Sequence, residues 1–172
     1  MRKQQSGFSL IEMLIVVVII LIVAAIAIPN LLRSRMAANE SASSSTVRTL
    51  TSSAVVYSTS YPQNGFPASL ANLGGASPCT PGPVTACLSD QALACAAQPC
   101  VRESYQYSLT GIGAGAPAPN TDFVLFSTAV SPSAGSKDYC VTQESVIRFQ
   151  NIATPPTGAF TTVSACAALS PL

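Results

Sequence analysis

The feature that most constrains this sequence is the apolar run at residues 13–28, which ends at Pro29. The run contains no glycine and no charge, and a helix of about 20 such residues is long enough to cross a bilayer. Arg2 and Lys3 precede it. Under the positive-inside rule they hold the N-terminus in the cytoplasm and place everything after Pro29 on the other side of the membrane. The sequence therefore predicts a single membrane-spanning helix at residues 8–29.

One carboxylate, Glu12, lies at the beginning of this segment, in the order Gly7-Phe8-Ser9-Leu10-Ile11-Glu12. Charged side chains cost about 2.5 to 3.5 kcal/mol at the centre of a membrane helix on insertion scales, so an acid here points to a function. The motif resembles the N-terminal signal of the type IV pilin and pseudopilin family. In that family a glycine precedes the processing point, phenylalanine is the first mature residue and glutamate is the fifth.

The resemblance implies that residues 1–7 are a leader, that a prepilin peptidase cleaves between Gly7 and Phe8, and that Phe8 is then N-methylated. It also implies that Glu12 acts in assembly, by pairing with the amine of Phe8 from a neighbouring subunit. The expected partners are identical or related pilin subunits, the inner membrane, the peptidase and the pilus assembly platform. The subunit is expected in the inner membrane first and in an extracellular filament afterwards.

The function that follows is a structural subunit of a type IV pilus filament. One alternative is a pseudopilin of a type II secretion system. Another is a secreted, disulfide-rich binding domain that signal peptidase releases after Ala27, because Ala25-Ile26-Ala27 has the A-x-A pattern of its cleavage sites. Glu12 counts against this second alternative, because the apolar core of a signal peptide is expected to be uncharged.

The composition argues against an enzyme. The sequence contains no histidine, the commonest general base and a frequent metal ligand, and only 9% of its residues are charged. No cofactor and no specific nucleic acid are predicted. Asp90, Asp122 and Asp138 could contribute to a calcium site, but they are single acids far apart in the sequence. They are better explained as solvated turn residues, and no metal site is predicted.

Beyond Pro29 the pattern becomes amphipathic at residues 30–58. Apolar side chains recur at helical spacing along one face, at Leu32, Met36, Val47, Leu50, Ala54 and Tyr57. We expect one helix from Phe8 to about Ser58, half membrane anchor and half spine of a soluble domain. Proline lacks an N–H, so a kink or a short unwound stretch is expected just before Pro29. The glycosylation sequon at Asn39 lies inside this helix and is discounted.

The rest of the chain predicts a loop and then a sheet. Residues 59–103 are rich in cysteine and proline, with one helical turn expected at Ser69–Leu73. Within residues 104–172, hydrophobic side chains alternate at Tyr105, Tyr107 and Leu109, and further apolar segments follow. The expected fold is α+β: the long helix packed on an antiparallel sheet of three or four strands, as in pilins. The tail from Thr154 is expected to be irregular.

Six cysteines without a C-x-x-C pair favour disulfides formed outside the cytoplasm over a zinc site. Cys140 and Cys166 are expected to pair, because this bond would tie a loose tail to the sheet. Six cysteines allow fifteen connectivities. Proximity alone suggests the other two pairs, Cys79 with Cys87 and Cys95 with Cys100.

Overall fold

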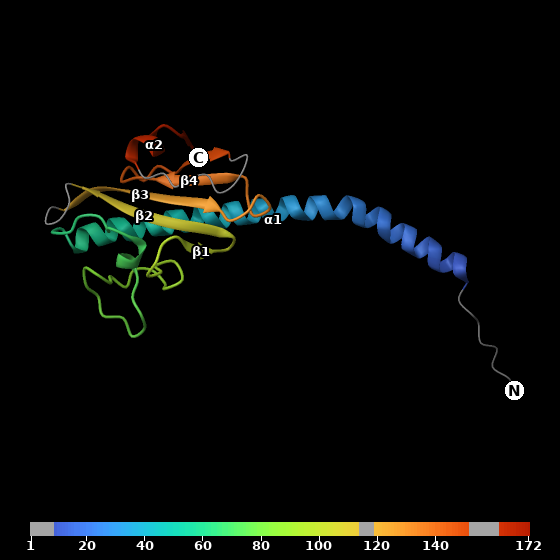
Figure 1. The fold of residues 1–172 in the computed structure, drawn as a ribbon, viewed down its shortest axis with the longest axis horizontal. Helices are drawn as coiled ribbons and strands as arrows, with labels where there is room; N and C mark the ends of the chain where they lie inside the picture. Colours follow the sequence, from blue (N-terminus) through green and yellow to red (C-terminus); the bar gives the residue numbers. More distant parts are fainter. Residues whose placement is uncertain (1–8, 114–118, 152–161) are drawn as a thin grey trace. The chain divides into compact units, whose positions relative to one another are not determined.

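The computed structural model describes residues 9–113, 119–151 and 162–172, and the chain divides into two compact units, Met1–Arg35 and Met36–Leu172. One helix, α1 (Leu10–Ser60), contributes to both units (Figure 1). Its bounds lie within two residues of those predicted. Helical structure continues through Pro29, so the unwound stretch expected there is absent from the described helix. The side-chain amide of Asn30 donates to the carbonyl of Ile26 at 3.1 Å, so a side chain adds a hydrogen bond to this turn.

In the first unit, α1 is apolar and exposed on every side. The large hydrophobic side chains between Leu10 and Leu32 are all exposed, from 45% at Val18 to 83% at Leu10. Among the described residues, α1 is the one helix long and apolar enough to cross a membrane, judged by length and composition. A helix that is hydrophobic all round requires a membrane or other helices to cover it.

In the second unit, six antiparallel strands form one sheet in chain order, counted over the described residues. The strands are β1 (Cys100–Arg102), β2 (Tyr105–Gly113), β3 (Asn120–Ala129), β4 (Lys137–Val141), β5 (Arg148–Asn151) and β6 (Ser170–Pro171). The prediction of three or four strands missed the two edge strands, β1 and β6. Both are three residues or fewer, too short to display an alternating pattern.

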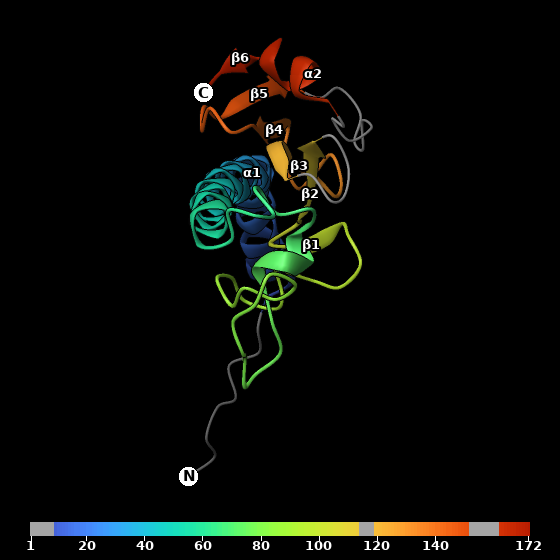
Figure 2. The ribbon, with the colours of Figure 1, turned by 90° about the vertical axis from the view of Figure 1, so that its left-hand side faces the viewer.

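The sheet packs one face against the second half of α1 (Figure 2). Val47, Leu50, Ala54 and Tyr57 of the helix are buried in one hydrophobic core with alternate residues of the strands. Leu32 was predicted on the same stripe, but it is 52% exposed, because the buried stripe begins only at Ser43.

Strand β3 is covered on both faces, which explains why its seven residues from Phe123 to Ala129 are all buried. One face contributes to the core with α1. The other packs Phe126 against Cys140 and Cys166, where the short helix α2 (Val163–Ala167) lies. Helix α2 and strand β6 correct the expectation of a wholly irregular tail; the part of that tail at residues 154–161 lies outside the described residues.

The connection from α1 to the sheet uses the predicted turn chemistry. Gly65 has a φ of 68°, and a side chain there would collide with the backbone of Asn120. The amide of Phe66 donates to the carbonyl of Asn120 at 3.0 Å, which fastens this turn to the start of β3. The expected helical turn is the 3-10 helix η1 (Leu70–Leu73), whose two leucines are buried in the core.

Candidate functional site

The candidate site is the exposed apolar part of α1 around Glu12. The amides of Glu12 and Met13 donate to the carbonyl of Ser9 at 3.1 and 3.3 Å, so Glu12 lies in the first turn of the described helix. A negative charge is favourable there, because the helix dipole is positive at its N-terminus. The Glu12 side chain is exposed and makes no hydrogen bond or ion pair within the described part of the chain. Gly7 and Phe8 lie outside the described residues.

A second arrangement, which the sequence did not reveal, fastens α1 to the turn between β3 and β4. We call it the helix clasp: Asn39 and Glu40 on the helix, Ala134 and Ser136 on the turn, and Lys137 at the start of β4. The Asn39 amide donates to the Ala134 carbonyl at 2.9 Å. One Glu40 carboxylate oxygen accepts from the backbone amide and the hydroxyl of Ser136, both at 2.8 Å. The other lies 3.7 Å from the Lys137 ammonium.

The clasp joins residues about 95 positions apart in the sequence, so no local pattern could have predicted it. Its helix residues coincide with the discounted glycosylation sequon at Asn39. Because the Asn39 amide nitrogen is engaged with the Ala134 carbonyl, the structure supplies an intramolecular role for this residue.

Next to the clasp, a buried polar cluster continues the contact between helix and sheet. The hydroxyls of Ser43 and Ser127 lie 2.6 Å apart, and both residues are fully buried. The Tyr107 hydroxyl faces this pair and Thr46; these groups lower its pKa, but burial is the larger effect and raises the pKa overall. The Ser43 and Ser127 hydroxyls satisfy each other, whereas the buried Tyr107 hydroxyl beside them has no hydrogen-bond partner within the described part of the chain.

Two further tyrosines lie deep in the same core. Burial raises the pKa of Tyr105, and the neighbouring Tyr139 adds to the effect. The Tyr105 hydroxyl donates to the Lys137 carbonyl at 3.0 Å. Burial, with a smaller contribution from Glu40, raises the pKa of Tyr139 to about 12. These are neutral core residues at ordinary pH.

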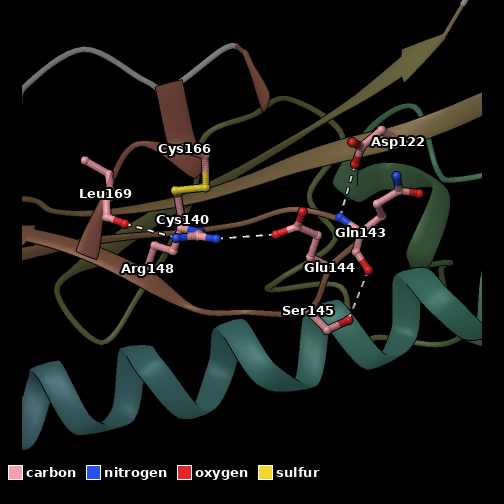
Figure 3. Close-up of polar contacts among 8 residues, drawn as sticks. All are labelled: Asp122, Cys140, Gln143, Glu144, Ser145, Arg148, Cys166 and Leu169. Carbon is pink, nitrogen blue, oxygen red and sulfur yellow. Dashed lines mark hydrogen bonds and ion pairs between the residues drawn. A yellow bond between two sulfur atoms is a disulfide. The ribbon is translucent and has the colours of Figure 1, made fainter. Parts of the chain in front are cut away.

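The disulfides join Cys79 with Cys87, Cys95 with Cys100, and Cys140 with Cys166, the same pairs that the sequence suggested. The third bond links β4 to α2, and Figure 3 shows it among the polar contacts that hold the C-terminal segment. Arg148 donates to the Leu169 carbonyl at 3.2 Å and pairs with Glu144 at 3.4 Å. The segment is therefore held covalently and by hydrogen bonds.

The three aspartates considered for calcium are engaged in separate contacts. Asp90 forms an ion pair with Arg102 at 2.7 Å. Asp122 accepts from the amides of Phe123 and Gln143, as Figure 3 shows in part. The buried Asp138 accepts from the side chain of Gln150, which lies on β5. The described residues contain no group of three or more potential metal ligands.

Comparison with known proteins adds information about the N-terminal segment. Residues 2–28 match the family model described as the prokaryotic N-terminal methylation motif. The matched range includes Gly7, Phe8 and Glu12 and ends at Ile28, so it covers the whole apolar run and the polar residues before it. No curated protein and no solved structure gives a significant match to the chain.

Proposed function

We propose that this chain is a structural subunit of a type IV pilus filament, starting from the methylation motif at residues 2–28, which marks type IV pilin- and pseudopilin-type precursors. Proteins with this motif are structural, and the motif implies processing by a prepilin peptidase and assembly into multi-subunit filaments. The observation that carries the proposal is the motif glutamate, Glu12, on a helix whose apolar surface is exposed on all sides.

Before assembly, the subunit lies in the inner membrane with its N-terminus in the cytoplasm. Basic residues flank the apolar segment on both sides, with Arg2 and Lys3 before it and Arg33 and Arg35 after it, so charge alone does not set this orientation. The three disulfides support it, because such bonds form and persist outside the cytoplasm. Residues 1–7 are then the leader, 8–29 the anchor and the filament core, and the sheet unit the filament surface.

Glu12 has no partner within the described chain, and in the filament its partner is the methylated amine of Phe8 from a neighbouring subunit. A buried charge without its partner is strongly unfavourable. This pairing therefore selects the stagger between adjacent helices. A pilus is favoured over a type II secretion filament because the bond between Cys140 and Cys166 encloses a C-terminal segment, a feature that the resemblance associates with pilins.

The decisive experiment is the Glu12→Val substitution in the full chain, compared with Met13→Val as a matched control on the same turn. Glu12→Val should insert into the membrane, keep its disulfides and give at least tenfold fewer sheared filaments, because the intersubunit charge pair is lost. Met13→Val should assemble normally. Normal filament yield from Glu12→Val would overturn the role of this carboxylate. Secretion of other proteins, measured in the same strains, separates a pilus from a secretion filament.

Processing provides an independent test. The mature protein should begin at Phe8, and replacing Gly7 with a bulky residue such as Phe should leave the leader attached. Filaments should then be absent although the protein still enters the membrane. N-terminal sequencing of sheared filaments and of membranes measures both effects. A mature protein that begins at Ile28 would support the secreted-domain alternative instead.

A further inference from the structure

Three arginines of α1 are exposed and have no partner within the described part of the chain: Arg33, Arg35 and Arg48. The other three basic residues of the described chain each lie within 4 Å of a carboxylate: Arg102, Lys137 and Arg148. The unpaired positive charge of the described residues is therefore confined to the long helix. Unpaired arginines on a helix whose first half is apolar and exposed need a physical explanation.

The position of Arg33 along α1 matches one boundary of a bilayer. Residues 13–32 form an uncharged stretch of 20 residues, with Glu12 before it and Arg33 after it. At a rise of 1.5 Å per residue this stretch is about 30 Å long, which equals the thickness of the hydrocarbon core of a bilayer. Arg33 then lies at the hydrocarbon boundary. Arg35 lies about 3 Å further along the axis, within the headgroup layer.

The directions of the two side chains favour a lipid environment over a single protein surface. Successive residues of a helix are about 100° apart around its axis, so Arg33 and Arg35 point in nearly opposite directions. One flat protein surface cannot contact both side chains at once. Headgroups surround an inserted helix on every side, so each arginine meets its own phosphate. Guanidinium groups bind phosphates with paired hydrogen bonds, which suits this contact.

We propose that Arg33 and Arg35 bind the headgroup phosphates of anionic phospholipids in the outer leaflet of the inner membrane before the subunit is assembled. This inference rests on the membrane stage of the proposed function. It assigns these two arginines a specific task, which is to set the depth of the helix so that Glu12 stays at the opposite boundary. Each arginine near the surface should favour an anionic lipid by about fivefold, and salt should weaken the effect.

The test uses the full chain reconstituted in bilayers of phosphatidylglycerol and phosphatidylcholine. Flotation first establishes insertion, and spin-labelled lipids then measure the preference of the lipids around the helix for phosphatidylglycerol. The double variant Arg33→Gln/Arg35→Gln should lose this preference severalfold. Arg48→Gln is the matched control, because Arg48 is exposed and unpaired on the same helix but lies about 20 Å beyond Arg35. Arg48→Gln should keep the lipid preference of the unsubstituted protein. Added salt should reduce this preference in both of these proteins.

Two results would overturn the inference while leaving the proposed function intact. One is the same lipid preference in the unsubstituted protein and both variants, with filament yield unchanged. The other is an unchanged preference combined with fewer filaments from the double variant, which would indicate that the arginines pair with carboxylates of a neighbouring subunit. A chain that fails to float with the vesicles would instead remove the membrane stage of the proposed function, and the inference with it.

Discussion

At the scale of single residues, hydroxyl and carboxylate groups decide how the helix meets the sheet. The contact contains the hydroxyl pair of Ser43 and Ser127, the Tyr107 hydroxyl and the Glu40 carboxylate. Each polar group on the helix side faces a partner that comes from a strand or from the turn between β3 and β4. These polar contacts specify where along α1 the sheet docks, which a purely apolar stripe defines less sharply.

The buried Tyr139 makes stability depend on alkaline pH. Its pKa in the folded protein is about 12, above the ordinary value of 10 that it regains on unfolding. Stability is therefore unaffected below pH 10 and falls as the pH rises towards 12, by about 2 to 3 kcal/mol from this residue. Urea unfolding in detergent at several pH values between 9 and 12 measures the fall.

Tyr139→Phe is the matched variant for this prediction, because it keeps the ring and removes the titrating hydroxyl. It should lose less stability over the same pH range than the unsubstituted protein. Equal losses in both proteins would mean that Tyr139 does not contribute to the alkaline dependence.

At the scale of elements, α1 performs two tasks because its composition changes along its length. Residues 13–28 are apolar on every side, and the second half carries one buried stripe from Ser43 to Tyr57. The first half is suited to a membrane or to a bundle of identical helices, and the second half serves as the spine of the sheet unit. The helix clasp at Asn39 and Glu40 marks where docking on the turn between β3 and β4 begins.

Removing the Glu40 carboxylate should loosen this docking. Glu40→Ala removes the charged acceptor of the Ser136 amide and hydroxyl; the Glu40 side chain is only 15% exposed, but Ser136 itself is exposed, so water replaces part of what is lost. The expected loss is about 1 to 3 kcal/mol in the free energy of unfolding. Hydrogen exchange of the turn between β3 and β4 should also rise, which localises the effect.

Glu103→Ala is the control for this prediction. Glu103 lies 3.7 Å from Arg102, but both side chains are more than a third exposed, so this pair should contribute little. Denaturant unfolding of the two variants in the same detergent compares them directly. A loss from Glu103→Ala as large as that from Glu40→Ala would contradict a specific role for the helix clasp.

At the scale of the whole molecule, three disulfides compensate for a modest core. Two of them close short loops between η1 and β1, and the third joins β4 to α2 across 26 positions of sequence. The third bond belongs to a second hydrophobic cluster, formed by Phe126, Cys140 and Cys166, against which Leu169 packs. The C-terminal segment is thereby kept on the face of the sheet opposite α1.

The double substitution Cys140→Ala/Cys166→Ala should reduce the free energy of unfolding by about 3 to 4 kcal/mol in the chain-entropy model. The same substitution at Cys79 and Cys87 opens a shorter loop and should cost less, about 2 to 3 kcal/mol. Guanidinium unfolding of both double variants under non-reducing conditions tests the order. A larger loss from the shorter loop would contradict the chain-entropy account.

Features that depend on local pattern could be predicted from the amino-acid sequence. Helical periodicity and the absence of glycine located α1 to within two residues, and alternation at Tyr105, Tyr107 and Leu109 located β2. The position of Glu12 within the motif was visible from its spacing to Gly7. These signals are contained in a few consecutive residues, so they can be recognised without knowledge of the tertiary structure.

Contacts between residues far apart in the sequence, in contrast, depend on how the elements pack. Strands β1 and β6 form because β2 and β5 supply their hydrogen bonds. Both strands are too short to show an alternating hydrophobic pattern of their own. The helix clasp and the pairing of Arg102 with Asp90 depend likewise on how elements pack. Within the residues that the structure describes, the absence of such partners for Arg33 and Arg35 also became visible only from the packing. Contacts across long loops are set by sheet register and helix docking, which no short window of sequence contains.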